Sequence, residues 1–323
     1  MVRRQGGKNT KIRVAINGFG RIGRILARII LQNPHFKLMQ VNDIYDTDMM
    51  YHLLKHDSSY GNFETDTKFK MTNHSDIKKL QWDNVDIVFE CSGVYHTKKE
   101  LSWHIKNGAK KVILSSFSKE LPTYIYGINE KEYKNESIIS NSSCTANCTV
   151  AVFKIIDKYL GIISAQITTI HSYTTDQNLL DNKNRDIRRS RSATQNIIPL
   201  SSNVANATVQ FLPHLKGKIT AESIRVPVIN GVLIDINILL KKKTSLLEIK
   251  KIIRSHINPK ISYFSNDHFV SSDIKKMPYS NIIDEELIKL SGKNLLKLML
   301  WQDNEYGYAR RILDMAEVVI RDS

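Results

Sequence analysis

The sequence has few cysteines and no long apolar run. Its three cysteines are unevenly spaced and provide no disulfide framework, so a reducing compartment such as the cytoplasm fits them best. No uninterrupted apolar stretch approaches the roughly 18 residues that span a bilayer. Residues 1–11 form a basic tail without the apolar core of a secretory signal. We therefore expect a cytoplasmic protein with no membrane anchor.

Acidic residues are scarce relative to basic ones, and the formal net charge of the 323-residue chain is +15. This charge suits anionic small molecules such as dinucleotides and sugar phosphates, and it would also suit nucleic acid. Lysine and arginine are dense only at 185–191 and 241–243, which favours a solvated basic surface over a nucleic-acid interface. The length allows two domains with full cores.

A glycine-rich turn follows the first predicted strand. Residues 13–16 form a short apolar strand, a helix ends near Leu31, and the turn between them has the spacing Gly-x-Gly-x-x-Gly. Such glycines allow a tight turn, close approach of a pyrophosphate and close packing of helix on strand, and the helix N-terminus receives the phosphate charge. The glycines are Gly18, Gly20 and Gly23.

An acidic residue follows at the distance that a dinucleotide site requires. A second strand, residues 38–42, ends at Asp43, about twenty residues beyond the turn. A carboxylate there can accept hydrogen bonds from both ribose hydroxyls and repels a 2′-phosphate. The combination predicts a site for NAD rather than NADP, against the alternative of a glycine turn with a purely structural role.

The order of the predicted elements indicates an α/β protein with two different sheets. The first half alternates strands and helices, as in a doubly wound parallel Rossmann sheet with ligands at the carboxyl ends of its strands. The second half has longer strands and a helix that begins with a capping box of Ser245 and Glu248, and it predicts an α+β catalytic domain with a mainly antiparallel sheet. The expected strands are 85–90, 111–114, 138–140, 165–170, 222–228, 232–240 and 296–301, and the expected helices are 49–54, 98–106, 149–160, 246–257 and 306–321.

The predicted division of the chain has four parts. They are the tail at 1–11, an NAD-binding Rossmann domain at 12–143, a catalytic domain at 144–305, and a helix at 306–323 that packs back on the NAD-binding domain.

Cys144 lies between a predicted strand and a predicted helix, where the backbone N–H groups and the helix dipole favour a thiolate. Further on, His171 ends another apolar strand, and a cysteine with an imidazole is a candidate pair for covalent catalysis. The alternative is that Cys144 is a small buried hydrophobe, as we expect for Cys91 and Cys148. No second Cys/His cluster follows at zinc-site spacing, so no metal site is predicted.

Six blocks of the sequence resemble phosphorylating glyceraldehyde-3-phosphate dehydrogenase, and related erythrose-4-phosphate dehydrogenases share most of them. They run in order from about residue 12 to the C-terminus, at 15–24, 140–148, 171–174, 196–199, 225–227 and 303–308.

The resemblance implies roles for the matching residues. Cys144 would be the nucleophile and His171 the base that deprotonates it. NAD would be held by Asn17, Gly18, Phe19, Gly20, Arg21, Ile22, Gly23, Asp43 and Ser115, and its nicotinamide end by Asn304 and Tyr308. Thr174 and Arg225 would bind the phosphate of the aldehyde substrate, whereas Ser143, Thr145, Ser202 and Asn203 would form the site for inorganic phosphate. The family is typically a homotetramer, and residues 178–195 resemble its loop that lines a neighbouring subunit's cofactor site.

The chain also departs from the family. Ala146 replaces a threonine, and Ile229 replaces a proline, as in the erythrose-4-phosphate branch. Asn203 replaces a glycine whose N–H should approach phosphate, and because asparagine tolerates left-handed backbone we expect the site to survive. The stretch 61–84 is short and lacks a hairpin that the cofactor domain of the family has. This difference affects the edge of the domain on the adenine side of NAD.

Three functions follow as hypotheses. The first, favoured by Thr174, is oxidative phosphorylation of glyceraldehyde 3-phosphate to 1,3-bisphosphoglycerate through a thioester on Cys144. The second is an erythrose-4-phosphate dehydrogenase whose thioester is hydrolysed by water, which Asn203 and Ile229 favour. The third is a non-catalytic protein that binds nucleic acid or a partner; the basic charge motivates it, and the intact catalytic residues oppose it.

Overall fold

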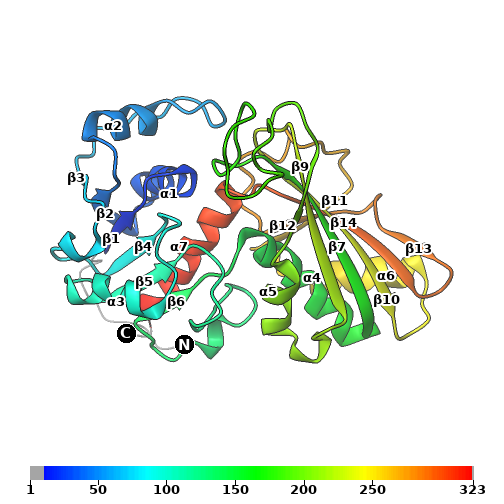
Figure 1. Cartoon of the computed structure of the whole chain (residues 1–323). Helices are drawn as coiled ribbons and strands as arrows, with labels where there is room; N and C mark the ends of the chain where they lie inside the picture. The colour runs from blue at the N-terminus through cyan, green and yellow to red at the C-terminus, as the bar shows by residue number, and fades with distance from the viewer. Residues whose placement is uncertain (1–10, 322–323) are drawn as a thin grey trace. The chain divides into compact units, whose positions relative to one another are not determined.

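The computed structural model describes residues 11–321, which fall into two compact units (Figure 1). Unit 1 holds the described residues up to Tyr124 together with 131–141 and those from Ile312 onward, and unit 2 holds 125–130 and 142–311. The predicted basic tail at 1–11 lies outside the described residues except for Lys11.

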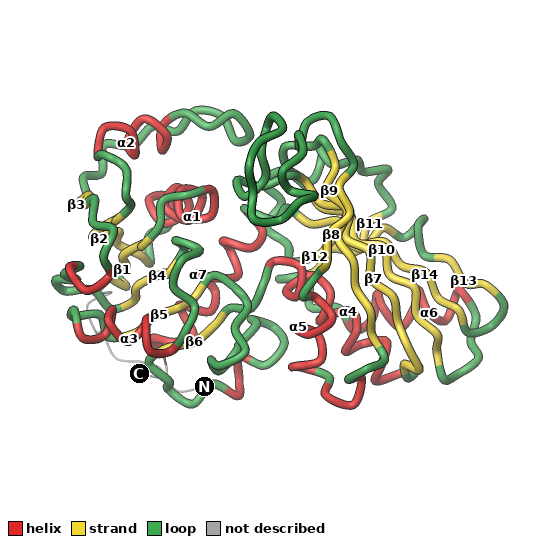
Figure 2. The backbone as a smooth tube through the Cα atoms, in the orientation of Figure 1, coloured by secondary structure: helices red, strands yellow, loops and turns green. Residues whose placement is uncertain are grey.

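Unit 1 contains a six-stranded parallel sheet (Figure 2). Its elements are β1 (Ile12–Asn17), α1 (Arg21–Gln32), β2 (Phe36–Asn42), α2 (Thr47–Lys55), β3 (Lys70–Thr72), η1 (Ile77–Lys79), β4 (Ile87–Glu90), α3 (Lys98–Lys106), β5 (Lys111–Leu114) and β6 (Ile138–Ser140), with the short turn η2 (Glu130–Glu132) before β6. The strand order is β3-β2-β1-β4-β5-β6, so the chain starts at the centre and winds outward on both sides. This is the order of a Rossmann sheet, and the predicted fold class is confirmed.

Local sequence explains these elements. The central strands β1 and β4 are apolar and buried, as expected for a parallel sheet covered on both faces. Helix α3 begins with a full capping box, in which Thr97 and Glu100 each bond the other's backbone. The short stretch 61–84 forms only β3 and η1 as regular elements, and β3 pairs in parallel with β2, so this described edge of the sheet carries no hairpin.

Unit 2 contains an eight-stranded mixed sheet. Its elements are α4 (Cys144–Leu160), β7 (Ile162–Ser172), β8 (Ile198–Ser201), α5 (Val204–Phe211), η3 (Pro213–Leu215), β9 (Ile219–Val226), β10 (Val232–Leu240), α6 (Leu246–His256), β11 (Ser262–Ser265), β12 (Asn281–Asp284), β13 (Lys289–Ser291), β14 (Leu295–Gln302) and the start of α7 (Tyr306–Arg321). The order is β11-β12-β14-β10-β7-β9-β8, with β13 beside β14. Most pairings are antiparallel, but β7 with β9 and β11 with β12 are parallel.

Alternate residues of the central strand β10 show which face of this sheet the helices cover. Val232, Ile234, Ile236 and Ile238 are buried and share one apolar cluster with residues of α4, α5 and α6. The residues between them are only partly buried. The helices therefore cover one face of a mainly antiparallel sheet, as predicted.

Several local predictions differ from the structure. The helix expected from residue 149 begins earlier, at Cys144, and the strand expected to end at residue 170 extends through Ser172. The capping box predicted at Ser245 and Glu248 is only half present: the Ser245 hydroxyl accepts from the Glu248 N–H, but the Glu248 carboxylate accepts from the Thr244 hydroxyl instead. That hydroxyl lies one residue before the cap and competes for the carboxylate.

Within residues 11–321, no helix is both long and apolar enough to cross a membrane. The described histidine, cysteine and acidic residues form no cluster that could hold a metal ion.

Candidate active site

The chain turns sharply before Cys144 and brings this residue to the start of α4. Ser142 has a left-handed backbone with φ 58°, which is uncommon for a residue other than glycine. Ser143 is the N-cap, and its hydroxyl accepts a hydrogen bond from the Ala146 N–H at 3.1 Å. Cys144 is half-buried, and its Sγ lies 3.8 Å from the Thr145 hydroxyl.

A row of residues crosses the end of the unit 2 sheet beside Cys144. His171 pairs with Arg225 on one side and with Val232 on the other, and Val232 pairs in turn with Gln302. Residues opposite one another in register lie on the same face, and Val232 is in the core against α4. The Gln302 amide donates to the Cys144 carbonyl oxygen at 2.6 Å. The sheet thus brings His171 and Arg225 to the face and the end at which α4 begins.

The Nδ1 atom of His171 has two polar neighbours. It lies 2.7 Å from the Ser172 carbonyl oxygen, to which an Nδ1 hydrogen would be donated while Nε2 presents a lone pair, whereas the Arg225 guanidinium can only donate to Nδ1. Arg225 also contacts Nδ1 and donates to the same carbonyl oxygen at 3.0 Å. Burial, and then the positive charge of Arg225, lower the pKa of His171 to about 3. The imidazole is therefore a neutral base at physiological pH.

The pKa of the Cys144 thiol differs from the expectation. Burial raises the pKa of Cys144, and the Thr145 hydroxyl and the charge of Arg225 only partly oppose this. The predicted resting thiolate is therefore wrong in direction, because loss of hydration disfavours the charge more than the helix terminus favours it. Burial also raises the pKa of Cys91 to about 12 and that of Cys148 well above its usual range, and neither has a cation that opposes the shift.

Arg225 has the features of an anion site. No carboxylate among the described residues pairs with it, and its buried Nε has no hydrogen-bond partner there. Burial and the charge of Arg189 lower the pKa of Arg225 to about 10. A guanidinium in this position offers a planar fork of donors to a phosphate.

The glycine turn of unit 1 fits a pyrophosphate. A Cβ atom at Gly18, whose φ is +93°, would lie 2.3 Å from the Ser92 backbone, and one at Gly23 would lie 2.1 Å from the Gly18 carbonyl oxygen. A Cβ at Gly20 would meet nothing within 4 Å. No side chain caps the N-terminus of α1 and no acidic residue lies in its first turn, so its N–H groups can receive an anion.

Asp43 lies against this turn, because its carboxylate accepts hydrogen bonds from the N–H groups of Phe19 and Ile44. The Ser115 hydroxyl donates to the Glu90 carbonyl oxygen at 2.9 Å, at the end of the adjacent strand. The Arg21 guanidinium pairs with Asp57 at 2.5 Å.

Comparison with known proteins identifies the family of both units. Residues 12–98 match the NAD binding domain of glyceraldehyde 3-phosphate dehydrogenase, and residues 143–304 match its C-terminal domain. The chain belongs to the glyceraldehyde-3-phosphate dehydrogenase family. It is 37% identical to a glyceraldehyde-3-phosphate dehydrogenase of Buchnera aphidicola over 95% of this chain and 98% of that protein. It is 38% identical to the chloroplastic form A of Chlamydomonas reinhardtii, over 96% and 89%, and 36% identical to form B of Aspergillus oryzae, over 95% and 98%.

Membership of this family makes the chain an NAD-dependent oxidoreductase that acts on aldehydes. The expectation drawn from the six sequence blocks is thereby confirmed at the level of the family and its cofactor.

The other predicted phosphate residues of this dehydrogenase lie in loops of unit 2. The Thr174 hydroxyl donates to Asp176, which also pairs with Arg189. The Ser202 hydroxyl accepts from the Val204 N–H at 3.3 Å, at the start of α5. Asn203 has φ −87°, so the left-handed backbone expected for it is not used.

Two predicted nicotinamide residues are buried at the same end of the sheet as His171. The Asn304 side-chain oxygen accepts from the Gly231 N–H at 3.3 Å and lies 3.5 Å from the Ser172 hydroxyl. The Tyr308 hydroxyl donates to the Ser142 carbonyl oxygen at 2.8 Å, and so supports the turn before Cys144.

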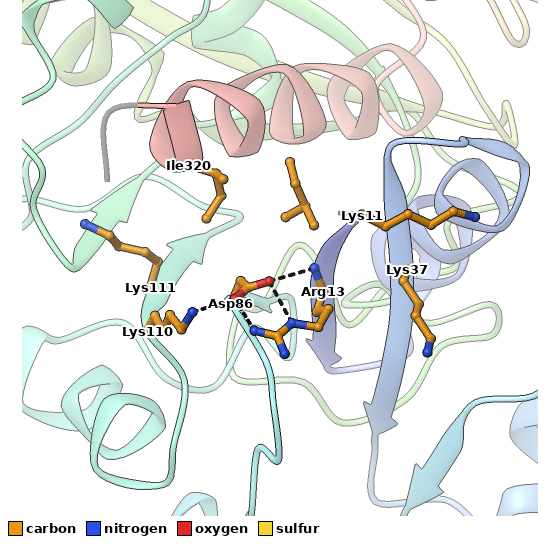
Figure 3. Close-up of a pocket in the computed structure, with 8 residues that line it drawn as sticks. Lys11, Arg13, Lys37, Asp86, Lys110, Lys111 and Ile320 are labelled. Carbon is orange, nitrogen blue, oxygen red and sulfur yellow. Dashed lines mark hydrogen bonds and ion pairs between the residues drawn. The ribbon is translucent and has the colours of Figure 1, made fainter. Parts of the chain in front are cut away.

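A cavity of about 850 Å³ lies at the amino ends of the unit 1 strands and has no part in these sites (Figure 3). Arg13 and Lys110 both pair with Asp86 there, and the Lys111 ammonium donates to Asn135. Lys11 points away from Asp86. Asp86 already pairs with Arg13 and Lys110, and Asn135 with Lys111, so the cavity is not a candidate anion site.

Sequence reasoning missed two residues of these sites. Gln302 touches the Cys144 backbone, and Glu90 is buried beneath the glycine turn. The available signal was the same for both, a polar residue that directly ends an apolar strand.

Proposed function

We propose that this dehydrogenase catalyses the oxidative phosphorylation of glyceraldehyde 3-phosphate to 1,3-bisphosphoglycerate, a step of glycolysis. The observation that supports this proposal is the row in which Arg225 and His171 lie side by side at the start of the Cys144 helix. It combines a nucleophile, a neutral base and a cation without an acidic partner.

Covalent chemistry at Cys144 follows from these groups. The thiol adds to the aldehyde carbon while His171 Nε2 accepts its proton, which gives a hemithioacetal. The backbone N–H of Cys144 and the imidazole stabilise the developing oxyanion, an effect of roughly 3–4 kcal/mol in comparable sites. NAD, when bound, supplies a nicotinamide ring that accepts a hydride. The thioester then left on Cys144 is cleaved by inorganic phosphate, which takes the acyl group and releases the sulfur.

The remaining residues bind the reactants in this proposal. Arg225 and Thr174 hold the phosphate of the aldehyde, and Asn304 and Tyr308 hold the nicotinamide end of NAD. Inorganic phosphate binds at the residues near the starts of α4 and α5, which are Ser143, Thr145, Ser202 and Asn203.

We also propose a cytoplasmic homotetramer. The three cysteines are free, which fits a reducing compartment. The face of the unit 2 sheet without helices carries the half-buried apolar side chains of Ile170, Leu233, Met299 and Trp301 on neighbouring strands. Such a face suits burial against another subunit.

Erythrose 4-phosphate oxidation is the second candidate, and the replacements Asn203 and Ile229 favour it. The test is to measure initial rates of NADH formation with each aldehyde, with and without inorganic phosphate. The proposal expects phosphate-dependent turnover that prefers glyceraldehyde 3-phosphate. Phosphate-independent turnover that prefers the four-carbon aldehyde would reverse this assignment.

A further inference from the structure

A buried carboxylate lies directly beneath the glycine turn of unit 1. Glu90 ends β4, is 1% exposed, and accepts three hydrogen bonds. They come from the Asn17 amide at 2.7 Å, from His104 Nε2 at 2.9 Å and from the Ser92 N–H at 2.7 Å. An acidic side chain in the interior requires a reason, because its burial is costly unless donors surround it.

His104 is fully buried on α3 and is oriented by a further contact. The Trp82 indole N–H donates to His104 Nδ1 at 3.0 Å. Because an indole can only donate, Nδ1 accepts and Nε2 carries the hydrogen that points at Glu90. Three donors and no acceptor therefore face the Glu90 side chain, which is the environment of a carboxylate.

Glu90 is also the end of a lateral chain of hydrogen bonds along the carboxyl edge of the sheet. The Asn17 side-chain oxygen accepts from the Asn42 amide at 2.8 Å, and the Asn42 oxygen accepts from the Thr72 hydroxyl at 2.9 Å. These residues end β1, β2 and β3. The chain thus links Glu90 to the strand before the glycine turn and to the strand before Asp43.

The two loops that Glu90 bonds are in direct contact. A Cβ at Gly18 would lie 2.3 Å from the Ser92 backbone, so the turn after β1 and the loop after β4 touch at this point. One carboxylate oxygen holds the Asn17 side chain before the first loop, and the other holds the Ser92 N–H within the second.

We propose that Glu90, oriented by His104, is a positioning residue for NAD: it fixes the separation of the turn 17–20 and the loop 91–93, between which the carboxyl edge of a Rossmann sheet receives its dinucleotide. Glu90 itself does not touch the cofactor. The inference rests on the NAD site of the proposed function.

The test is Glu90→Gln with Asp86→Asn as a matched control. Glutamine has one acceptor oxygen for three donors, so at least one donor loses its partner without a change in side-chain size. Asp86 lies at the amino ends of the same two strands, where it accepts from the Arg13 N–H at 3.0 Å and from its guanidinium at 2.8 Å (Figure 3). Both variants remove one negative charge and weaken the pairing of β1 with β4, but at opposite ends.

We expect E90Q to weaken NAD binding, measured calorimetrically, by about tenfold or more. Its KM for NAD should rise by a similar factor, with a smaller change in kcat. D86N should lower the melting temperature as E90Q does while its Kd for NAD stays within about twofold of the wild type. Equal, unchanged NAD affinities in the two variants would overturn the proposal and leave Glu90 with a structural role only.

A second variant keeps the test decisive if E90Q does not fold. Glu90→Asp retains the charge, but its side chain is one methylene shorter and cannot reach both Asn17 and Ser92. Weaker NAD binding by E90D supports the positioning role, and wild-type affinity contradicts it. Failure of the proposed function is distinguishable, because the wild-type enzyme itself would then form no NADH from either aldehyde.

Discussion

Replacement of Arg225 separates substrate binding from the chemistry at Cys144. One guanidinium nitrogen is already used by the Ser172 carbonyl oxygen and His171, whereas Nε has no partner among the described residues. Nε and the second terminal nitrogen are thus available to a phosphate. Hydrogen bonds to charged groups contribute about 1.5–3 kcal/mol each. Two of them correspond to a loss of roughly 10²–10⁴ in kcat/KM for Arg225→Ala.

A substrate without phosphate provides the internal control. Arg225→Ala also removes a positive charge that lowers the pKa values of His171 and Cys144, so both should rise. That change affects all aldehydes alike, whereas loss of the phosphate contact affects only phosphorylated ones. The ratio of kcat/KM for glyceraldehyde 3-phosphate to that for glyceraldehyde should therefore fall by the full factor. Arg225→Lys, which keeps the charge but not the fork, should lose about 10–100-fold. An equal loss for both substrates would refute the assignment of Arg225 to the substrate phosphate.

Three further predictions concern the thiol, the sheet edge and the assembly. Iodoacetamide should label Cys144 far faster than Cys91 or Cys148, and because burial raises the Cys144 pKa the rate should climb steadily between pH 6 and 8; a plateau below pH 7, located by peptide mapping, would show a resting thiolate instead. The Asp86 pKa is lowered to about 2. The Asp86 carboxylate therefore contributes about 2 kcal/mol to the free energy of unfolding above pH 4, and this contribution is lost as the pH falls towards 2. Urea unfolding of D86N and wild type should therefore differ at pH 7 and converge at about pH 2, and a constant difference would exclude this linkage. Leu233→Asp on the half-buried sheet face should dissociate the proposed tetramer in sedimentation measurements, whereas Lys216→Asp, on an exposed turn, should not.

Much of the fold could be predicted because its signals are local. The glycine turn with Asp43 and the alternation of strands and helices gave the Rossmann sheet, and α3 and β5 have the predicted bounds. The short strands β3, β8, β11, β12 and β13 were missed. They have three or four residues each, and only pairing with neighbouring strands makes them strands.

The residues proposed for the site could be selected from the sequence, but their electrostatics could not. Cys144 and His171 follow from strand ends, whereas the lateral contacts of Gln302 and Glu90 depend on cross-strand register, which distant parts of the sequence determine together. The raised pKa of Cys144 likewise depends on packing between distant parts of the sequence. A helix start is visible in the sequence, but the burial that outweighs it arises from tertiary packing.

The most direct test of the account is to trap the acyl-enzyme. Wild-type protein mixed with NAD and glyceraldehyde 3-phosphate in the absence of inorganic phosphate, then quenched in acid, should carry an acyl group on the Cys144 peptide by mass spectrometry. Added phosphate should remove this group and release an acyl phosphate. Cys144→Ser should show neither the adduct nor the burst of NADH, with turnover reduced at least ~10³-fold. Undiminished aldehyde oxidation by Cys144→Ser, or an acyl group on a different residue, would contradict the central claim.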